Sequence, residues 1–208
     1  MLQDIRNVVF DLGGVIVDLE IDRVRACFLE IGMPKMAALM DPCYPAEMNE
    51  QMESGQISWE EACEKMRTLD NRPDITNDQI RWVYEEFLSR VDEEKLRTIE
   101  QLRARGIRTY ILSNTNPVAI EIVREHFRRH GRELDAMFDG IFLSFQLGIL
   151  KPSPAIFEEV IRRADIRPEE TLFIDDGARN ADAAHALGFQ VFCPETNGEF
   201  KQLFEAEV

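Results

Sequence analysis

Residues 7–14, NVVFDLGG, join a short apolar run to an acidic residue and a pair of glycines. The apolar run is too short for a helix, which indicates a buried strand. Asp11 stands where that strand ends, and Gly13 and Gly14 allow a tight backbone turn directly after it. The stretch therefore predicts a strand that delivers a carboxylate to its C-terminal end.

Downstream of residue 91 the sequence alternates between helical and strand-like segments. Strands are predicted at 107–112, 140–144, 171–174 and 189–193, and helices at 93–105, from 117, at 154–164 and at 179–187. Strands separated by helices of this length form parallel sheets that helices cover on both faces. The predicted fold class is therefore α/β, a doubly wound, mainly parallel sheet with a Rossmann-like core.

Between the first strand and residue 91 the pattern changes to helical spacing. Residues 21–90 contain almost no strand-like runs, and two capping boxes, Ser58 to Glu61 and Thr76 to Gln79, indicate helix starts. We expect about four helices, which would form a small all-α cap inserted after the first strand. The expected domains are an α/β core of residues 1–18 and 91–208 and a helical cap of residues 19–90.

The charge balance is strongly acidic. The chain has 39 Asp and Glu against 24 Lys and Arg, a net charge of -15 and a pI of about 4.7. This charge opposes binding to nucleic acid and to anionic membranes, and no apolar stretch approaches the length of a spanning helix. We expect a soluble, cytoplasmic protein, a monomer or weak homodimer, without nucleic-acid or membrane partners.

Several other chemistry-bearing residues are expected to have structural or solvated roles. Without a CxxC pair or a histidine at zinc spacing, the cysteines are expected to be reduced, buried and apolar in character. The cysteines are Cys27, Cys43, Cys63 and Cys193. The histidines, His126, His130 and His185, are expected on helix surfaces, and the acids Asp18 and Glu20 are expected to be solvated.

Polar side chains follow four of the predicted strands, where an open parallel sheet binds its ligands. They are Asp11, Ser113, Asn114, Lys151, Asp175 and Asp176. Three carboxylates in one crevice repel one another, so a positive partner is required. All-oxygen ligation without His or Cys indicates Mg²⁺. Together with a lysine, a hydroxyl and glycine-turn amides, the ion would form a socket for a phosphoryl group.

Four motifs, taken in order, resemble those of the haloacid dehalogenase-like hydrolase superfamily. They are Asp11-Leu12-Gly13-Gly14-Val15, Leu112-Ser113-Asn114, Lys151-Pro152, and Asp175-Asp176 followed by Asn180. The match spans nearly the whole chain, and the helical insert is similar to the small helical cap of the sugar-1-phosphate phosphatase-like branch. Each motif alone is weak, but four in order with the right strand context are specific.

The resemblance implies a magnesium-dependent phosphatase, a phosphoric monoester hydrolase, that acts on a small phosphorylated metabolite such as a hexose 1-phosphate. Asp11 would be the nucleophile and form an aspartyl-phosphate that water hydrolyses, and Lys151 would neutralise the charge shared by Asp11 and the phosphate. Substrate binding is assigned to Leu12, Gly13, Ser113, Asn114 and Lys151. Magnesium binding is assigned to Asp11, the Gly13 carbonyl, Asp175 and Asp176, with Asn180 orienting the surrounding water.

One position departs from the superfamily pattern. Most of its phosphatases carry a second aspartate two residues after the nucleophile, acting as general acid and then general base, and here that residue is Gly13. General acid–base catalysis is worth roughly 10²–10⁴-fold, so another group must serve or the leaving group must be good. Two alternatives stay open: a catalytically silent module that binds a phosphometabolite or a partner, and a metal-independent 2-haloacid dehalogenase.

Overall fold

The core of the protein is a five-stranded parallel sheet in the order β5-β4-β1-β6-β7. The structure, a computed structural model, describes residues 4–40 and 47–205 of the chain. The strands are β1 (Asn7–Phe10), β4 (Arg108–Ser113), β5 (Gly140–Leu143), β6 (Thr171–Ile174) and β7 (Gln190–Phe192). The predicted α/β fold with a mainly parallel sheet is confirmed.

Strand β1 lies at the centre of the sheet and is buried on both faces. Val8 and Phe10 pack into one hydrophobic cluster, whereas Val9 packs into the cluster on the opposite face. Phe10 pairs in register with Ile111 of β4 and Ile174 of β6. The C-terminal ends of β1 and β6 are therefore level, and β4 continues a little further, to Ser113, so the residues at and after these ends lie at one edge of the sheet.

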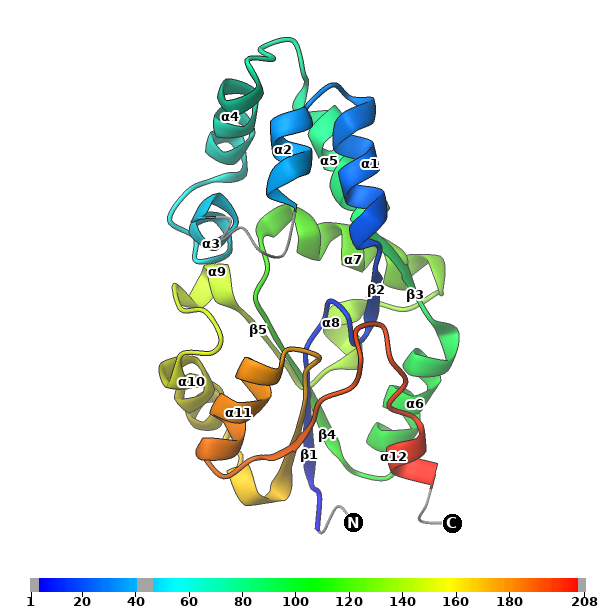
Figure 1. The fold of residues 1–208 in the computed structure, drawn as a ribbon. Helices are drawn as coiled ribbons and strands as arrows, with labels where there is room; N and C mark the ends of the chain where they lie inside the picture. Colours follow the sequence, from blue (N-terminus) through cyan, green and yellow to red (C-terminus); the bar gives the residue numbers. More distant parts are fainter. Residues whose placement is uncertain (1–3, 41–46, 206–208) are drawn as a thin grey trace.

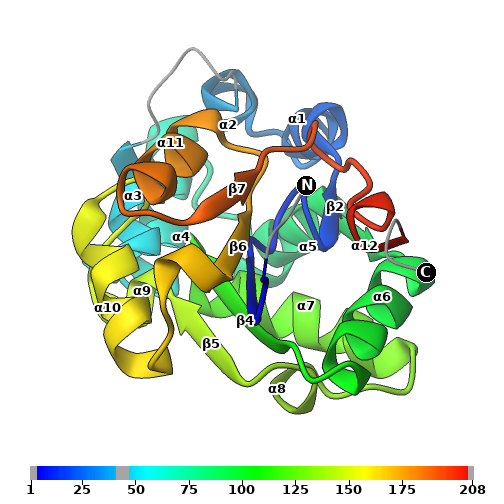
Figure 2. The ribbon, with the colours of Figure 1, turned by 90° about the horizontal axis from the view of Figure 1, so that it is seen from below.

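Helices cover both faces of the sheet, as Figure 2 shows with α10 and α11 on one side and α6 and α7 on the other. The helices of this core are α6 (Glu93–Ala104), α7 (Pro117–Arg129), α8 (Leu134–Met137), α9 (Ser144–Leu147), α10 (Pro154–Ala164), α11 (Ala178–Ala186) and α12 (Gln202–Glu205), with a 3₁₀ turn at Pro168–Glu170. The sequence identifies the start of α7, where the Asn116 side chain accepts hydrogen bonds from two backbone amides. It misses α9, because four residues are too few to show helical periodicity.

Five described helices form a separate layer beyond the C-terminal edge of the sheet, at the top of Figure 1. They are α1 (Ile21–Glu30), α2 (Pro34–Leu39), α3 (Glu47–Glu53), α4 (Trp59–Asp70) and α5 (Asn77–Phe87), here called the helical unit. Their apolar side chains form a hydrophobic cluster of their own. Both predicted capping boxes are present, at the starts of α4 and α5. None of the described helices has the length and apolar character needed to span a membrane.

The helical unit is joined to the core through a short antiparallel pair that the sequence did not reveal. The pair consists of β2 (Val17–Leu19) and β3 (Leu88–Val91). Its two strands are about 70 residues apart in the chain, so their pairing is a tertiary event with no local sequence signal. Figure 1 shows the pair between the helical unit and the sheet.

Asp18 on β2 is buried, and the expectation that it is solvated is wrong. Its carboxylate accepts a hydrogen bond from Lys95 at 3.1 Å and one from Arg90 at 2.7 Å, and Lys95 is itself buried. A buried carboxylate needs such partners because desolvation otherwise disfavours its charge. The cluster therefore fixes the strand pair that carries the helical unit.

Two further solvent-exposure expectations need correction. His126 is buried, with Nε2 at 2.7 Å from the Leu88 carbonyl oxygen, and burial lowers the pKa of the imidazole. Cys27 and Cys63 are buried as expected, but Cys193 is exposed, and Cys43 lies outside the described residues. In each case the deciding factor is which helix or strand packs against the residue, and local sequence does not encode that.

Candidate active site

Three carboxylates meet at the C-terminal edge of the sheet. One oxygen each from Asp11, Asp175 and Asp176 lies within 4.8 Å of the others. Asp11 follows β1, and the adjacent acids follow β6, the neighbouring strand. Parallel register between these strands is therefore sufficient to bring together residues that are more than 160 positions apart.

Lys151 supplies the positive charge within this cluster. Its Nζ lies 2.9 Å from Oδ1 of Asp11 and 2.6 Å from Oδ2 of Asp175, and it donates a third hydrogen bond to the Leu112 carbonyl at 3.0 Å. The Lys151 side chain is 1% exposed. All three ammonium protons are thus used, and the two neighbouring carboxylates act against desolvation to raise the pKa of Lys151 above its ordinary value.

The Asp11 carboxylate is held in one orientation. Its Oδ1 accepts a hydrogen bond from the Leu12 backbone amide at 2.7 Å as well as the contact from Lys151. Burial raises the pKa of Asp11 to about 7; Lys151 acts in the opposite direction, and Asp175 raises it further. A second positive charge at this edge would relieve that cost, which makes the cluster a suitable place for a cation.

The two adjacent aspartates differ in how their oxygens are used. Asp175 is fully buried, and its oxygens accept hydrogen bonds from Lys151, from the Gly177 amide at 2.8 Å and from Asn180 Nδ2 at 3.0 Å. Asp176 is partly exposed and accepts one hydrogen bond, from Thr196 Oγ1 at 2.6 Å. Asp176 therefore keeps oxygen lone pairs available, whereas Asp175 is engaged by protein donors.

The Asn114 amide is engaged with the backbone of Lys151. Its Oδ1 accepts from the Lys151 amide at 2.9 Å, and its Nδ2 donates to the Lys151 carbonyl at 3.0 Å. Ser113 is buried, with Oγ 3.4 Å from the Asn114 carbonyl oxygen, a distance at which a hydrogen bond is weak. Ser113 thus has a hydroxyl free to turn toward a ligand, while Asn114 fixes the loop that carries Lys151.

A loop near the C-terminus supports the turn after β1, and no sequence motif had drawn attention to it. The Asn197 backbone amide donates a hydrogen bond to the Gly14 carbonyl at 2.7 Å. The Asn197 side chain accepts a hydrogen bond from the Leu19 amide and donates one to the Leu19 carbonyl. Gly14 has φ +75°, and a Cβ there would lie 2.3 Å from an Asp176 oxygen. Only glycine permits this close approach of the turn to the acidic cluster.

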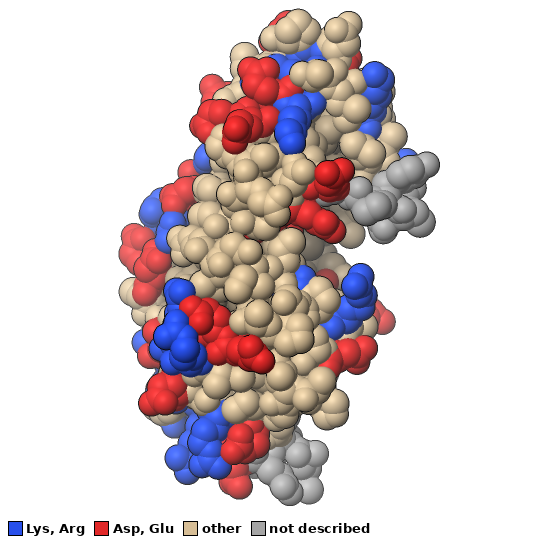
Figure 3. Space-filling model, turned by 90° about the vertical axis from the view of Figure 1, so that its left-hand side faces the viewer, with Lys and Arg blue, Asp and Glu red and all other residues tan. Residues whose placement is uncertain are grey.

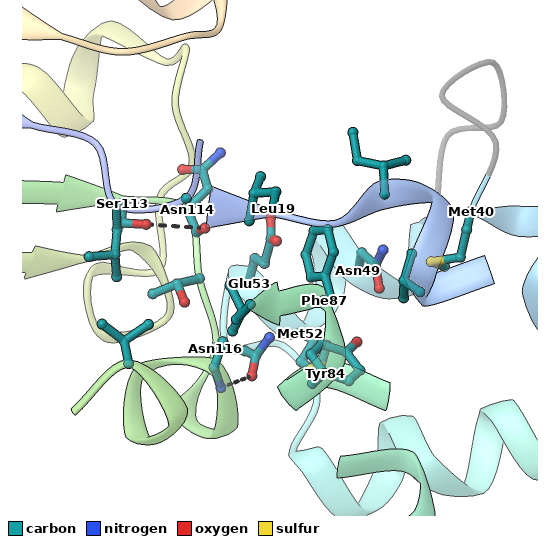
Figure 4. A pocket seen from close by; sticks show the side chains of 18 of the residues that line it. Leu19, Met40, Asn49, Met52, Glu53, Tyr84, Phe87, Ser113, Asn114 and Asn116 are labelled. Atoms are coloured by element: carbon teal, nitrogen blue, oxygen red, sulfur yellow. Dashed lines mark hydrogen bonds between the residues drawn. The ribbon is translucent and has the colours of Figure 1, made fainter. Parts of the chain in front are cut away.

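A cavity of about 460 Å³ lies between this edge and the helical unit. Figure 3 shows the corresponding indentation of the surface, with acidic and basic side chains interspersed on that face. The core contributes the turn after β1, the loop after β4, the start of α7 and Asp176. The helical unit contributes mainly apolar side chains together with Asn49, Glu53 and Tyr84, which Figure 4 shows around the cavity.

Two α3 residues in the cavity wall had not been predicted as site residues. Burial raises the pKa of Glu53 to about 7, helped by the negative charge of Asp11, whereas Lys151 lowers it. Asn49 Oδ1 is buried and accepts no hydrogen bond from any residue within 4–40 or 47–205. Met52, on the same helix, is buried and lines the cavity. Residues 47–53, EMNEQME, are as polar as a solvated helix, so the sequence gives no signal of this role.

The fold and site define a haloacid dehalogenase-like hydrolase, and the model of that family matches residues 5–188. The chain belongs to this family, as the motif resemblance indicated. It is 34% identical over 199 residues to the D-ribitol-5-phosphate phosphatase of Bacteroides thetaiotaomicron, covering 95% of this chain and 96% of that protein. The relative agrees with the predicted enzyme class, a phosphoric monoester hydrolase.

Solved structures of haloacid dehalogenase family proteins are similar to this chain over nearly its whole length. A haloacid dehalogenase-like hydrolase from Porphyromonas gingivalis superimposes with a TM-score of 0.88 at 35% identity, over 98% of this chain and 97% of that one. A family enzyme from Bacteroides thetaiotaomicron, solved in complex with magnesium and inorganic phosphate, gives a TM-score of 0.88 at 29% identity, over 96% and 99%. The fold is thus shared over essentially the whole length of these proteins.

Proposed function

We propose that the protein is a magnesium-dependent phosphatase that hydrolyses a small phosphorylated metabolite through an aspartyl-phosphate on Asp11. The observation that carries the proposal is the convergence of Asp11, Asp175, Asp176 and Lys151 at one edge of the sheet, where Asp11 and Asp176 line a cavity. Membership of the hydrolase family and similarity to a magnesium- and phosphate-bound relative support it.

The donor set fits Mg²⁺. Among the described residues the cluster consists of carboxylates without His or Cys, and one lysine is too little charge for three clustered carboxylates. Asp11, Asp176 and the Gly13 carbonyl would hold the ion, with Asp175 behind them, because its oxygens already accept hydrogen bonds from Lys151, Gly177 and Asn180. A bound ion supplies Lewis acidity and neutralises the charge of the phosphoryl group.

Asp11 acts as the nucleophile. A carboxylate oxygen forms a bond to phosphorus while the bond from phosphorus to the ester oxygen breaks, and water then releases phosphate from Asp11. The bonds from Leu12 and Lys151 hold the carboxylate in place, so little orientational freedom is lost in the reaction. Ser113 and the Gly13 amide bind the phosphate oxygens, the charge of Lys151 attracts them, and Asn114 positions Lys151 through its backbone.

The organic part of the substrate is uncharged and hydroxylated. Among the described residues that line the cavity there is no Lys or Arg, so nothing there would pair with a second phosphate or a carboxylate. Asn49 Oδ1 needs a hydrogen-bond donor, and a substrate hydroxyl would provide one. A polyol or sugar monophosphate fits both features, as in the phosphatase relative named for D-ribitol 5-phosphate. A hexose 1-phosphate satisfies the same conditions.

Phosphate release tests the proposal, measured with 4-nitrophenyl phosphate and with a panel that includes ribitol 5-phosphate and glucose 1-phosphate. We expect turnover with Mg²⁺, none with a chelator, and loss of turnover in Asp11→Asn. Activity that survives Asp11→Asn would overturn the mechanism.

Because position 13 is a glycine, the second candidate is a catalytically silent module that binds a phosphometabolite or a partner, and phosphate binding without turnover across the panel would favour it. Metal-independent halide release from 2-chloropropionate would favour a dehalogenase.

A further inference from the structure

The Asp11 edge of the cavity has no evident proton donor for the leaving group. Position 13 is a glycine, Asp175 is saturated with hydrogen bonds, and Lys151 is bound between two acids and a carbonyl. The described residues that line the cavity include no His or Cys. Burial raises the pKa of the Tyr84 phenol above its ordinary value, which makes it a poor donor at neutral pH.

Among the described residues of the helical unit, Glu53 is the acidic one that lines this cavity. It lies at the end of α3, and its carboxyl group stands apart from the three carboxylates that cluster within 4.8 Å. Figure 4 shows its side chain projecting into the cavity between Asn114, on the core side, and Phe87, on the side of the helical unit. A substrate with its phosphate at Asp11 would extend past this carboxyl group.

The backbone of Glu53 is docked directly onto the core. Ser144, a fully buried residue that begins α9, donates its hydroxyl to the Glu53 carbonyl at 2.6 Å and accepts the Thr115 amide at 3.0 Å. Gly55 packs so closely on α9 that a Cβ there would lie 2.5 Å from the Phe145 carbonyl oxygen. The position of Glu53 is therefore tied to the loop after β4, which begins directly after Ser113.

The electrostatic surroundings allow Glu53 to hold a proton near neutral pH. Burial raises the pKa of Glu53 to about 7, the negative charges of Asp11 and Glu50 add to this, and Lys151 acts in the opposite direction. Asp176 faces the same cavity from the loop after β6. A group that exchanges protons near the operating pH can serve as acid in one step and as base in the next.

We propose, on the basis of the phosphatase function above, that Glu53 is the general acid and base of this enzyme. The helical unit would thus supply the catalytic residue that is missing at position 13, where this chain has a glycine and not an aspartate. In the first step Asp11 attacks phosphorus, the bond to the ester oxygen breaks, and the Glu53 carboxyl gives its proton to that oxygen, forming the alcohol. In the second step the Glu53 carboxylate takes a proton from water while the water oxygen attacks phosphorus. The bond to Asp11 breaks, phosphate leaves, and both acids return to their starting states.

The test is Glu53→Gln with Mg²⁺ present, using 4-nitrophenyl phosphate and the alkyl phosphate of the panel that the wild type hydrolyses fastest. Nitrophenolate leaves without protonation, so its first turnover stays near the wild-type rate. Water attack then becomes slow, and we expect a burst of nitrophenolate of about one per site followed by a steady state slower by roughly 10²–10⁴-fold. For the alkyl ester the first turnover also falls by this factor. With 4-nitrophenyl phosphate, whose slow step needs the Glu53 carboxylate as base, the decrease in kcat that protonation of Glu53 causes on the acidic side of the pH profile is lost.

Glu47→Gln is the matched control, because Glu47 lies on the same helix, is exposed and does not line the cavity. It should retain wild-type rates and the burst-free time course, and Glu53→Asp should recover part of the activity. The proposal is overturned if Glu53→Gln keeps wild-type steady-state rates, or if the first turnovers of both esters fall equally. If the wild type releases no phosphate from any ester, the proposed function itself fails, a result distinct from either of these.

Discussion

The edge of the sheet and the wall formed by the helical unit face each other across one cavity, but they are built differently. At the edge, charged groups are paired by short hydrogen bonds, as in the contacts of Lys151 with Asp11 and Asp175. The opposite wall is mainly apolar and carries a carboxyl group on Glu53 and an unsatisfied oxygen on Asn49. Under the proposed function, the edge would bind the phosphoryl group and the wall would contact the rest of the substrate.

Among the variants described below, replacing Lys151 should have the largest combined effect on activity and stability, because Lys151 pairs the charges at the edge. In Lys151→Met, Asp11 and Asp175 lose their shared cation, and we expect kcat/KM to fall by about 10²–10³-fold. Because two buried acids are left without a partner, the free energy of unfolding should fall by about 3–5 kcal/mol without Mg²⁺, and by less with it. Steady-state kinetics and urea unfolding measure the two effects.

Lys95→Met provides the matched control for that experiment. It removes a buried lysine from the Asp18 cluster, which lies outside the residues that line the cavity. Stability should fall while kcat stays close to the wild-type value. Equal losses of kcat in the two variants would mean that Lys151 acts through stability alone.

The pH dependence of stability tests the edge further, because burial raises the pKa of Asp11. Its pKa in the folded protein is about 7, above the ordinary value of 3.8. The contribution of Asp11 to the free energy of unfolding is therefore fully present below about pH 4, where the carboxyl is protonated, and is lost as the pH rises through about 7. In magnesium-free protein at about pH 8, Asp11→Asn should exceed the wild type in stability by on the order of 2 kcal/mol.

Urea unfolding of the two magnesium-free proteins across this pH range measures the difference, and Asp11→Asn should give the flatter curve. Added Mg²⁺ should stabilise the wild type more at high pH than at low pH, because the metal needs the deprotonated carboxylate. Parallel curves for the two proteins would contradict the assigned role of burial.

Ser144→Ala addresses how the wall is attached to the edge. The substitution removes the hydroxyl that links the Glu53 carbonyl to Thr115, so Glu53 should lose its fixed position. We expect about a tenfold loss of kcat on the alkyl phosphate, consistent with one hydrogen bond, and little change in the first turnover of 4-nitrophenyl phosphate. Ser54→Ala is the control, since that hydroxyl bonds to carbonyls within its own segment, and it should leave kcat unchanged.

The smallest expected effect concerns Asn49 and the substrate hydroxyl. Asn49→Leu removes the unsatisfied acceptor and should raise KM for a polyol phosphate by about three- to tenfold, with kcat nearly unchanged. For 4-nitrophenyl phosphate, which has no hydroxyl, KM should stay the same or decrease. An equal rise in KM for both substrates would show that Asn49 contributes to the shape of the cavity and does not accept a hydrogen bond from the substrate hydroxyl.

The local sequence contains enough information to predict the sheet and the residues that follow its strands. The sequence predicts strand β6 with its observed bounds, Thr171–Ile174, because a threonine and three apolar residues between charged neighbours are too short a run for a helix. The start of α7 followed from Asn116 and Pro117, since a cap and a proline act locally. Pairing of β2 with β3 and the burial of Asp18 did not follow, because both require partners distant in the chain.

The sequence by itself determined that acids, a lysine and a hydroxyl would follow the strands of a parallel sheet, since strand patterns and turns are local properties. Tertiary structure alone decided that Glu53 enters the cavity while Glu50, three residues earlier on the same helix, remains exposed. That choice depends on how Ser144 and the backbone beside Gly55 dock α3 onto the core. Docking of one packed unit on another is set by surfaces assembled from the whole chain, and a seven-residue polar segment does not encode it.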